Sequence, residues 1–352
     1  MIDWLSSMRQ TFEFYTVNPS TWGDERLIDT VKTCTINRDE EEDTLGSATL
    51  DCTEALGECY VRIYLIVIQN GRRYKKALGT VLVQTPSVAF DGKIKSISMD
   101  AYTPLLELKE KLPPFGYTVL KGENIMNTAS RLCRENMRAP VVAGESGITL
   151  FNDFVSDISE DWLSFLTDFI AYAKFHFSLD EMGRILFAPK QEVASLQPVW
   201  TYDDTNSSIL YPDITVDRDL YGIPNVVEVI YSTDTSYYYS RVVNDDPNSP
   251  ISTVNRGREI MHRTSNPELP GEPTQAQIDK YAEQLLRDLS SLEYTLSYTH
   301  GYCPVRIGDC VRLNYVRAGL ENIKAKVIRQ SIKCEPGCPV TETAVFTTKL
   351  WG

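Results

Sequence analysis

The hydrophobic positions of residues 274–289 recur at the spacing of an α-helix. Successive apolar side chains fall at i, i+3 and i+4, which places them on one face. These positions are Ile278, Tyr281, Ala282, Leu285, Leu286 and Leu289. Thr274 and Gln277 have the spacing of a capping box, and Pro270, Gly271 and Pro273 precede them as helix breakers. The pattern therefore predicts a helix that begins next to Thr274.

The hydrophobic period changes to two directly after this helix. Apolar or aromatic residues alternate with Thr and Ser from Tyr294 to His300, which indicates a half-buried strand. Gly308 and Asp309 predict a turn, because Gly tolerates positive φ and Asp can bond its own backbone. A second strand follows, and its inward positions are Val311, Leu313 and Tyr315. A helix followed by hairpins carries no chemistry by itself and favours a scaffold.

The N-terminal third also has the pattern of β structure. Alternate residues of 60–68 form one apolar face, made of Val61, Ile63, Leu65 and Val67. Asn70 and Gly71 then predict a type I′ hairpin turn. The return strand is expected to be interrupted at Gly79, and Asp91 with Gly92 predicts another turn.

The middle third has a different character. Pro113 and Pro114 break the chain, and residues 124–138 and 160–175 then show helical spacing. Residues 175–187 predict a strand, a turn at Glu181, Met182 and Gly183, and a second strand. This part is expected to be a compact α/β unit between β regions.

The last third returns to strands, which are predicted at residues 225–232, 236–243, 323–333 and 340–350. Asn244 starts a long polar segment that reaches Pro273, and a loop of that length is usually functional or mobile. The strand–turn–strand pattern that begins at Gly79 is echoed after Gly308, which favours two related β-barrels.

We therefore predict an α+β fold, mainly β, in which two tube-like antiparallel β-barrels flank a small α/β domain. The first barrel is expected at residues 1–105 and the α/β domain, with two helices, at 106–200. The second barrel is expected at 201–352, with a long loop at 244–273 and a helix at 274–289.

Composition narrows the possible functions. The chain has 352 residues, of which 42% are hydrophobic and 24% charged, as in a folded soluble protein of two or three domains. Its net charge is −13, which argues against a dedicated nucleic-acid binder because phosphate contacts need a basic surface. A surface past which nucleic acid slides remains compatible with this charge.

The cysteines are expected to be buried, reduced thiols. The chain start lacks the basic and apolar parts of a signal peptide, and no apolar run approaches a membrane span. Cys303, Cys310, Cys334 and Cys338 would supply four sulfurs to zinc. The six residues between the first two exceed the usual ligand spacing, so the spacing favours thiols and leaves metal binding open.

Familiar catalytic motifs are absent from the sequence. It has no phosphate-binding loop, dinucleotide fingerprint, zinc-protease helix or Gly-x-Ser-x-Gly elbow. His176 and His300 occupy apolar faces of predicted strands, which favours core or interface positions. The pairs Asp203–Asp204 and Asp245–Asp246 lie in polar stretches and are expected to be solvated. No catalytic residue, cofactor or metal is predicted, and the chain is not expected to be an enzyme.

Short motifs in a fixed order run along nearly the whole chain. They are YVRIY at 60–64, LGTVLV at 78–83, FDGK at 90–93, DAYTPLLEL at 100–108, GYTVLKGENI at 116–125, the helix at 274–289, RIGDCV at 306–311 and TKLW at 348–351. In this order and spacing the chain resembles the bacteriophage tail or baseplate hub family. That family includes relatives of the late control protein D and the hub portion of type VI secretion spike proteins.

The resemblance implies a structural protein of the virion tail, made in the host cytoplasm. Such hubs are homotrimers whose subunits each carry two tube-like barrels, so that three chains imitate a six-fold ring. The expected partners are the tail tube or distal tail protein, the spike or tip protein, the tape-measure protein, and DNA that passes through the lumen without specific binding. Insertion of this chain into a membrane is not expected.

The resemblance also assigns structural roles to six positions. They are Gly79, Gly92, Tyr102, Gly122, Gly308 and Asp309. The sequence ends at Trp351–Gly352 without an added cell-wall-cleaving or spike domain, so a minimal hub is expected. The alternatives are a tail-associated cell-wall hydrolase and a distal tail adaptor or carbohydrate-binding component.

Overall fold

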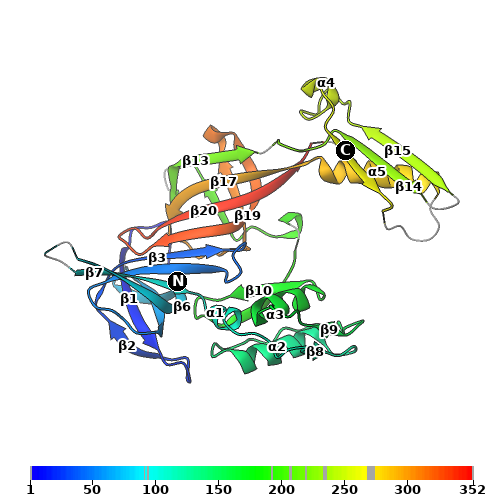
Figure 1. Cartoon of the computed structure of the whole chain (residues 1–352). Coiled ribbons are helices and arrows are strands. Elements are labelled where there is room, and N and C mark those ends of the chain that lie inside the picture. The colour runs from blue at the N-terminus through cyan, green and yellow to red at the C-terminus, as the bar shows by residue number, and fades with distance from the viewer. Residues whose placement is uncertain are drawn as a thin grey trace. The chain divides into compact units, whose positions relative to one another are not determined.

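Strands dominate the chain in this computed structural model, which confirms the mainly β, α+β class (Figure 1). The structure describes residues 2–90, 92, 95–191, 193–205, 208–218, 220–232, 236–267 and 274–350. Two compact units are present: residues 1–214 with 297–344, and residues 215–296 with 345–352. The predicted domain boundaries after residues 105 and 200 stay predictions.

The first β-region contains seven strands of the first unit. In sheet order they are neighbours as β3-β4-β7-β6-β5-β1-β2, and every adjacent pair is antiparallel. Their bounds are β1 Arg9–Val17, β2 Asp24–Ile28, β3 Val31–Asp39, β4 Gly46–Cys52, β5 Cys59–Gln69, β6 Arg72–Phe90 and β7 Lys95–Tyr102.

The β5–β6 hairpin confirms one prediction and corrects another. Asn70 and Gly71 both have positive φ, at 51° and 72°, as a type I′ turn requires. The predicted interruption at Gly79 is wrong, because β6 runs through it without a break. A register shift lies there instead: Ile63 pairs with Gly79 while Tyr64 pairs with Ala77. A bulge keeps the strand paired where the sequence pattern suggests a stop.

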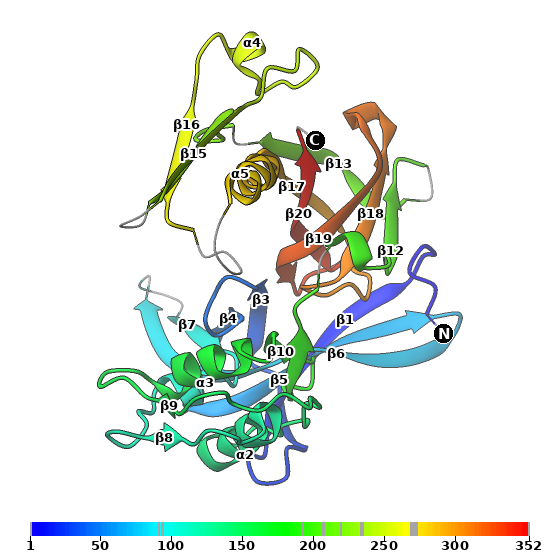
Figure 2. The same ribbon diagram turned by 90° about the vertical axis from the view of Figure 1, so that its right-hand side faces the viewer.

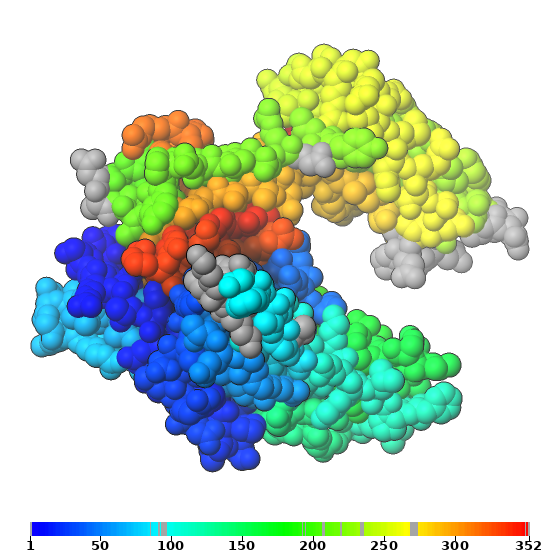
Figure 3. Space-filling view, turned by 60° about the vertical axis from the view of Figure 1, so that its left-hand side comes forward, coloured from blue at the N-terminus to red at the C-terminus, as the bar shows by residue number. Residues whose placement is uncertain are grey.

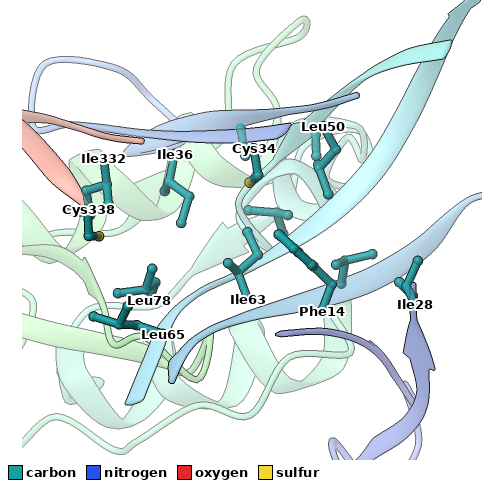
Figure 4. Close-up of a cluster of buried hydrophobic side chains, with 14 of the residues drawn as sticks. Phe14, Ile28, Cys34, Ile36, Leu50, Ile63, Leu65, Leu78, Ile332 and Cys338 are labelled. Atoms are coloured by element: carbon teal, nitrogen blue, oxygen red, sulfur yellow. The ribbon is translucent and has the colours of Figure 1, made fainter. Parts of the chain in front are cut away.

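The hydrophobic core of this region includes side chains from the far end of the chain. Phe14, Ile63 and Leu65 meet Ile332 and Cys338 in one buried cluster (Figure 4). Figure 3 likewise shows the red C-terminal strands lying against the blue N-terminal ones. The first β-region is therefore completed by residues of the second.

The second β-region joins the same sheet. β19 pairs antiparallel with β3, with Arg329 opposite Asp39 and Ile332 opposite Ile36. The sheet path runs onward from β19 to β20, β17 and β13, and β18 pairs with β19 and, in parallel, with β12. The bounds are β12 Trp200–Asp203, β13 Leu210–Arg218, β17 Ser291–Gly301, β18 Cys310–Tyr315, β19 Leu320–Lys333 and β20 Pro339–Lys349. The two β-regions thus share a continuous sheet, whereas closure into barrels stays a prediction.

The α/β region lies between the two β-regions in the sequence, and Figure 2 shows its helices and short strands grouped together. It has its own hydrophobic core. Asn124 and Asp161 accept hydrogen bonds from backbone N–H groups and cap its two longer helices. Both predicted helices are confirmed, although each is shorter than its predicted range. The elements are α1 Leu106–Lys109, β8 Thr118–Val119, α2 Ile125–Asn136, β9 Phe154–Val155, α3 Trp162–Ala171, β10 Phe175–Leu179, β11 Ile185–Pro189 and a 3-10 turn at Val193–Ser195.

The second unit is a three-stranded sheet with one helix on it. The sheet order is β15-β14-β16, and Ile278, Ala282 and Leu286 of the helix α5 pack on Val227 and Val229 of β14. The elements are β14 Val226–Ser232, β15 Tyr237–Val243, α4 Thr253–Arg256, β16 Met261–Ser265 and α5 Gln275–Leu289. The capping box of Thr274 and Gln277 is confirmed.

The helix α5 covers the β14–β15 face of this sheet. One expectation for this unit is wrong. We expected a polar loop from Asn244 onward, but this segment contains α4 and β16. The buried Asn225 side chain holds it in place, since it donates to Ile251 and Arg258 and accepts from Ile260. Pro270, Gly271 and Pro273 lie outside the described residues.

Candidate functional site

A single turn of the α/β region contacts both β-regions. It joins β10 to β11 at residues 180–183, as the sequence predicted, and Gly183 takes φ of +72° to close it. The Met182 carbonyl accepts hydrogen bonds from Trp22 Nε1 at 2.7 Å and from Arg62 at 3.2 Å. Thr80 Oγ1 donates to the Glu181 carbonyl at 3.2 Å. We call residues 180–183 the joint turn.

The packing around the joint turn leaves no space at Gly183. A Cβ atom there would lie 2.7 Å from Thr80 Cβ and 3.2 Å from the Trp22 ring. The first distance is shorter than van der Waals contact permits, so only glycine fits without displacement. The turn is therefore seated closely on the first β-region.

The Glu181 carboxylate connects the two β-regions through charge. It lies 3.9 Å from Arg38 of β3 and forms a closer ion pair with Arg306, in the segment before β18. Arg38 also donates to Gln330 of β19 at 2.9 Å and to the Leu78 carbonyl of β6 at 2.5 Å. These contacts fix the first β-region, the second and the α/β region against one another.

Arg62 is a buried cation in contact with the joint turn. Its side chain is only 1% exposed, and it binds Asp24 at 2.8 Å and Thr80 at 2.9 Å. Burial raises the pKa of Asp24, but hydrogen bonds from Tyr64 and Lys75 and the charge of Arg62 outweigh it and lower that pKa. Asp24 is thus held as the counter-ion that a buried guanidinium requires.

A second polar cluster lies buried inside the second β-region. Glu342 accepts hydrogen bonds from Tyr298 at 2.9 Å, Tyr202 at 3.2 Å and Gln330 at 2.6 Å, and His300 Nε2 lies 3.2 Å from it. Glu342 and His300 have no exposed surface. Gln330 connects this cluster to Arg38, and hence to the joint turn.

His300 and Glu342 each stabilise the charged form of the other. Burial disfavours a charged His300, but hydrogen bonds with Cys303 and Glu342 raise its pKa to about 10. Burial also raises the pKa of Glu342, yet His300, Gln330 and Tyr298 together lower it. The pair is therefore a buried ion pair with satisfied partners. Both charged groups are fully buried, so the pair is shielded from solvent.

The predicted structural residues do not form one site. Gly79 lies inside β6, while Tyr102 ends β7 and pairs with Ser47 and Leu82. Gly92 has φ of +91°, but Asp91 beside it lies outside the described residues, as does Trp351. Gly122 has φ of +89° and donates to Leu150 in the α/β region. Their functional roles stay predictions.

Gly308 and Asp309 do lie next to the joint turn. Gly308 has φ of +85° and donates to the Val327 carbonyl, which confirms the predicted turn. Asp309 accepts from the Arg306 backbone, and burial raises its pKa despite the nearby Arg306 charge. This turn therefore positions Arg306, the partner of Glu181.

A hollow of about 780 Å³ opens beside the joint turn. Trp4, Trp200, Tyr302, Arg306 and Asp309 are among its lining residues. Within the described part of the chain, no group of three or more His, Cys, Asp and Glu residues is placed to hold a metal ion. All eight cysteines are free thiols. No described helix has both the length and the apolar character to cross a membrane.

The sequence did not single out Arg62 or Glu342 as parts of a site. Arg62 interrupts an otherwise apolar run, and Glu342 occupies an inward position of a strand. A charged residue at a position whose neighbours on both sides are core is the signal that would have indicated them.

Solved structures have a similar fold over nearly the whole length of this chain. A tail protein from Neisseria meningitidis MC58 matches with a TM-score of 0.61 at 12% identity, covering 97% of this chain and 98% of its own. The 43 kDa tail protein of prophage MuSo2 from Shewanella oneidensis matches with a TM-score of 0.63 at 11% identity. This match covers 95% of this chain and 98% of that one. A Francisella PdpA–VgrG complex matches with a TM-score of 0.55 at 9% identity, covering 97% of this chain and 53% of that one.

These likenesses identify the class of fold. The chain has the fold of phage tail proteins, as the sequence resemblance predicted. No protein-family model matches the sequence, and no curated protein matches it.

Proposed function

We propose that the protein is a structural tail hub, three copies of which form a ring that imitates six-fold symmetry. The ring joins the tail tube or distal tail protein to a spike or tip protein at the end of the virion tail. DNA passes through its lumen, and the tape-measure protein is a further partner. The protein acts as a scaffold and not as an enzyme.

The observation that carries this proposal is the fold itself, shared with two tail proteins over at least 95% of each chain. A hub subunit needs two β-regions held at a fixed angle, so that three subunits present six similar elements. The continuous β19–β3 pairing and the joint turn supply such rigidity. The net charge of −13 suits a lumen that must not retain DNA.

The experiment is assembly of the purified chain with its own tail-tube protein, observed by electron microscopy. We expect rings that cap the end of the tube. A chain that remains monomeric at high concentration and forms no ring beside the tube protein would argue strongly against the proposal. Clearing of purified cell walls by the chain alone would instead support a hydrolase.

A further inference from the structure

Two cysteines that are distant in the sequence lie opposite each other where the two β-regions join. The β3–β19 register ends with Lys333 opposite Thr35. The next residues on the two strands are Cys334 and Cys34, and the Cys334 N–H donates to the Cys34 carbonyl at 2.8 Å. The antiparallel pairing therefore continues past the end of β19 as far as these two cysteines.

Both cysteine side chains lie on the inner face of this pairing. Side chains of directly opposite residues point to the same side of a sheet. Cys34 is 3% exposed in the hydrophobic core of the first β-region, and Cys334 packs against the same core. Figure 4 shows Cys34 and Ile36 pointing from β3 into that core. The two thiols therefore share one environment.

The spacing of opposite residues suits a disulfide bond. Directly opposite residues of antiparallel strands have Cα atoms about 4.5–5.5 Å apart. The Cα atoms of two cysteines in a disulfide are usually about 4.4–6.8 Å apart. A bond between Cys34 and Cys334 therefore needs little movement of the strands.

The two thiols differ in their access to solvent. Cys334 is half-buried, whereas Cys34 is buried. A dissolved reagent therefore reaches the Cys334 sulfur first. A hydrogen bond with the Cys34 thiol, together with burial, raises the pKa of Cys334, so this sulfur is protonated near neutral pH. Because the thiolate is the reactive form, the pair is expected to react slowly at neutral pH and faster as the pH rises.

We propose that Cys34 and Cys334 form a disulfide when the chain meets a small oxidised disulfide such as glutathione disulfide. The Cys334 thiolate attacks one sulfur of the oxidant, forms a mixed disulfide and releases the first glutathione thiolate. Cys34 then gives up its proton, attacks the Cys334 sulfur of the mixed disulfide and releases the second glutathione. Two protein thiols are oxidised, and one glutathione disulfide is reduced to two thiols.

The disulfide joins the two β-regions covalently, because β3 belongs to the first and β19 to the second. It closes a loop that contains most of the chain, and a long loop restricts the unfolded state strongly. Under the proposed function, the chain leaves the reducing cytoplasm with the virion, so oxidation follows assembly. The chemistry of the pair itself does not rest on that function.

Cys338 is the competing partner for Cys334, since it follows in the next turn and is buried in the same core. Trypsin separates the two possibilities, because it cleaves after lysine and arginine and releases residues 33–38 and 334–349 as different peptides. A bond from Cys34 to Cys334 links these two peptides. A bond from Cys334 to Cys338 lies within the second peptide alone.

The test incubates the full chain with glutathione disulfide at mildly alkaline pH, blocks the remaining thiols by alkylation, and digests it for mass spectrometry. Before alkylation, the intact mass should fall by about 2 Da, the loss of two hydrogen atoms. Peptides 33–38 and 334–349 should appear as one linked species that dithiothreitol separates. The Tm of the oxidised chain should rise by about 5 °C and return after reduction.

Cys334→Ala and, independently, Cys34→Ala should form no link and gain no Tm on oxidation, while circular dichroism confirms that they fold. Cys59→Ala is the matched control, because Cys59 is also half-buried against this core but lies opposite Val83, and it should keep the link. A bond within peptide 334–349, a lasting glutathione adduct on Cys334, or eight free thiols after prolonged oxidation would overturn the proposal. A linked chain whose Tm does not rise would overturn the stabilising role of the bond.

Discussion

Gly183 occupies a position in the joint turn where a side chain has no room. Its φ of +72° strains any other residue, and a Cβ would lie 2.7 Å from Thr80 Cβ. Gly122 offers a comparison, because its φ is +89° but no atom lies within 4 Å of its Cβ position. The two glycines therefore separate the effect of strain from that of close packing.

Gly183→Ala should lower the free energy of unfolding by about 2–5 kcal/mol, the sum of backbone strain and overpacking. Gly122→Ala should cost only the strain, about 1–2 kcal/mol. Urea denaturation of both variants checks this difference. Equal losses would mean that the joint turn is less closely seated than its distances indicate.

The His300–Glu342 pair gives a pH prediction at the same scale. A pKa of His300 raised to about 10 means that its stabilisation is complete below the ordinary histidine pKa and is lost as pH rises through 10. At pH 6, His300→Gln should cost about 3–5 kcal/mol, because Glu342 then keeps a buried, unpaired charge.

Denaturation of the native chain and of His300→Gln, measured from pH 6 to pH 10, checks this. The gap between the two unfolding free energies should narrow as pH rises. Titrations elsewhere in the chain affect both proteins alike and cancel in the difference. Parallel curves would show that His300 is not charged in the folded protein.

The helix α5 shows what the sequence can and cannot predict about an element. Thr274, Gln277 and the apolar stripe predicted its start and its buried face, because capping and helical period are local. They did not predict that β14 and β15 cover this face, because a stripe does not specify its partner. Similarly, the β19–β3 pairing joins Arg329 to Asp39, and no local pattern encodes such a distant register.

The same distinction applies to the candidate site. The joint turn was predicted from Glu181, Met182 and Gly183, which are local turn residues. Its contacts with Arg62 and Arg306 depend on how three regions meet, so no local pattern of residues indicated them. The role of Glu342 was missed for the same reason.

Loss of the cap on α5 should be measurable within the second unit. Thr274→Ala removes the side-chain bond to the Gln277 backbone and should cost about 1 kcal/mol. Hydrogen exchange should speed up in the first turn of α5, whereas Thr274→Ser should retain the cap and its protection. Unchanged exchange in the alanine variant would contradict the assigned capping role.

The turn before β18 provides a further prediction. Gly308→Val places a β-branched residue at φ of +85°, which should cost about 2–3 kcal/mol and impair ring assembly, since Arg306 is displaced from Glu181. No atom lies within 4 Å of the Cβ position, so Gly308→Asn, which tolerates positive φ, should assemble normally. Normal assembly of the valine variant would refute this role of the turn.

At the scale of the whole molecule, the continuous sheet and the joint make the first unit one rigid building block. The buried core contains both Phe14 and Ile332, so each β-region supplies part of the hydrophobic core of the other. The proposed three-copy ring requires a rigid subunit that carries two β-regions. The number of copies in each ring therefore distinguishes the proposed hub from a distal tail adaptor.

Native mass spectrometry of the complex with the tube protein measures that number directly. The proposed hub requires three copies of this chain in each ring. Six copies would indicate a distal tail adaptor instead, and a mass that corresponds only to the single chain, even with the tube protein present, would contradict the hub.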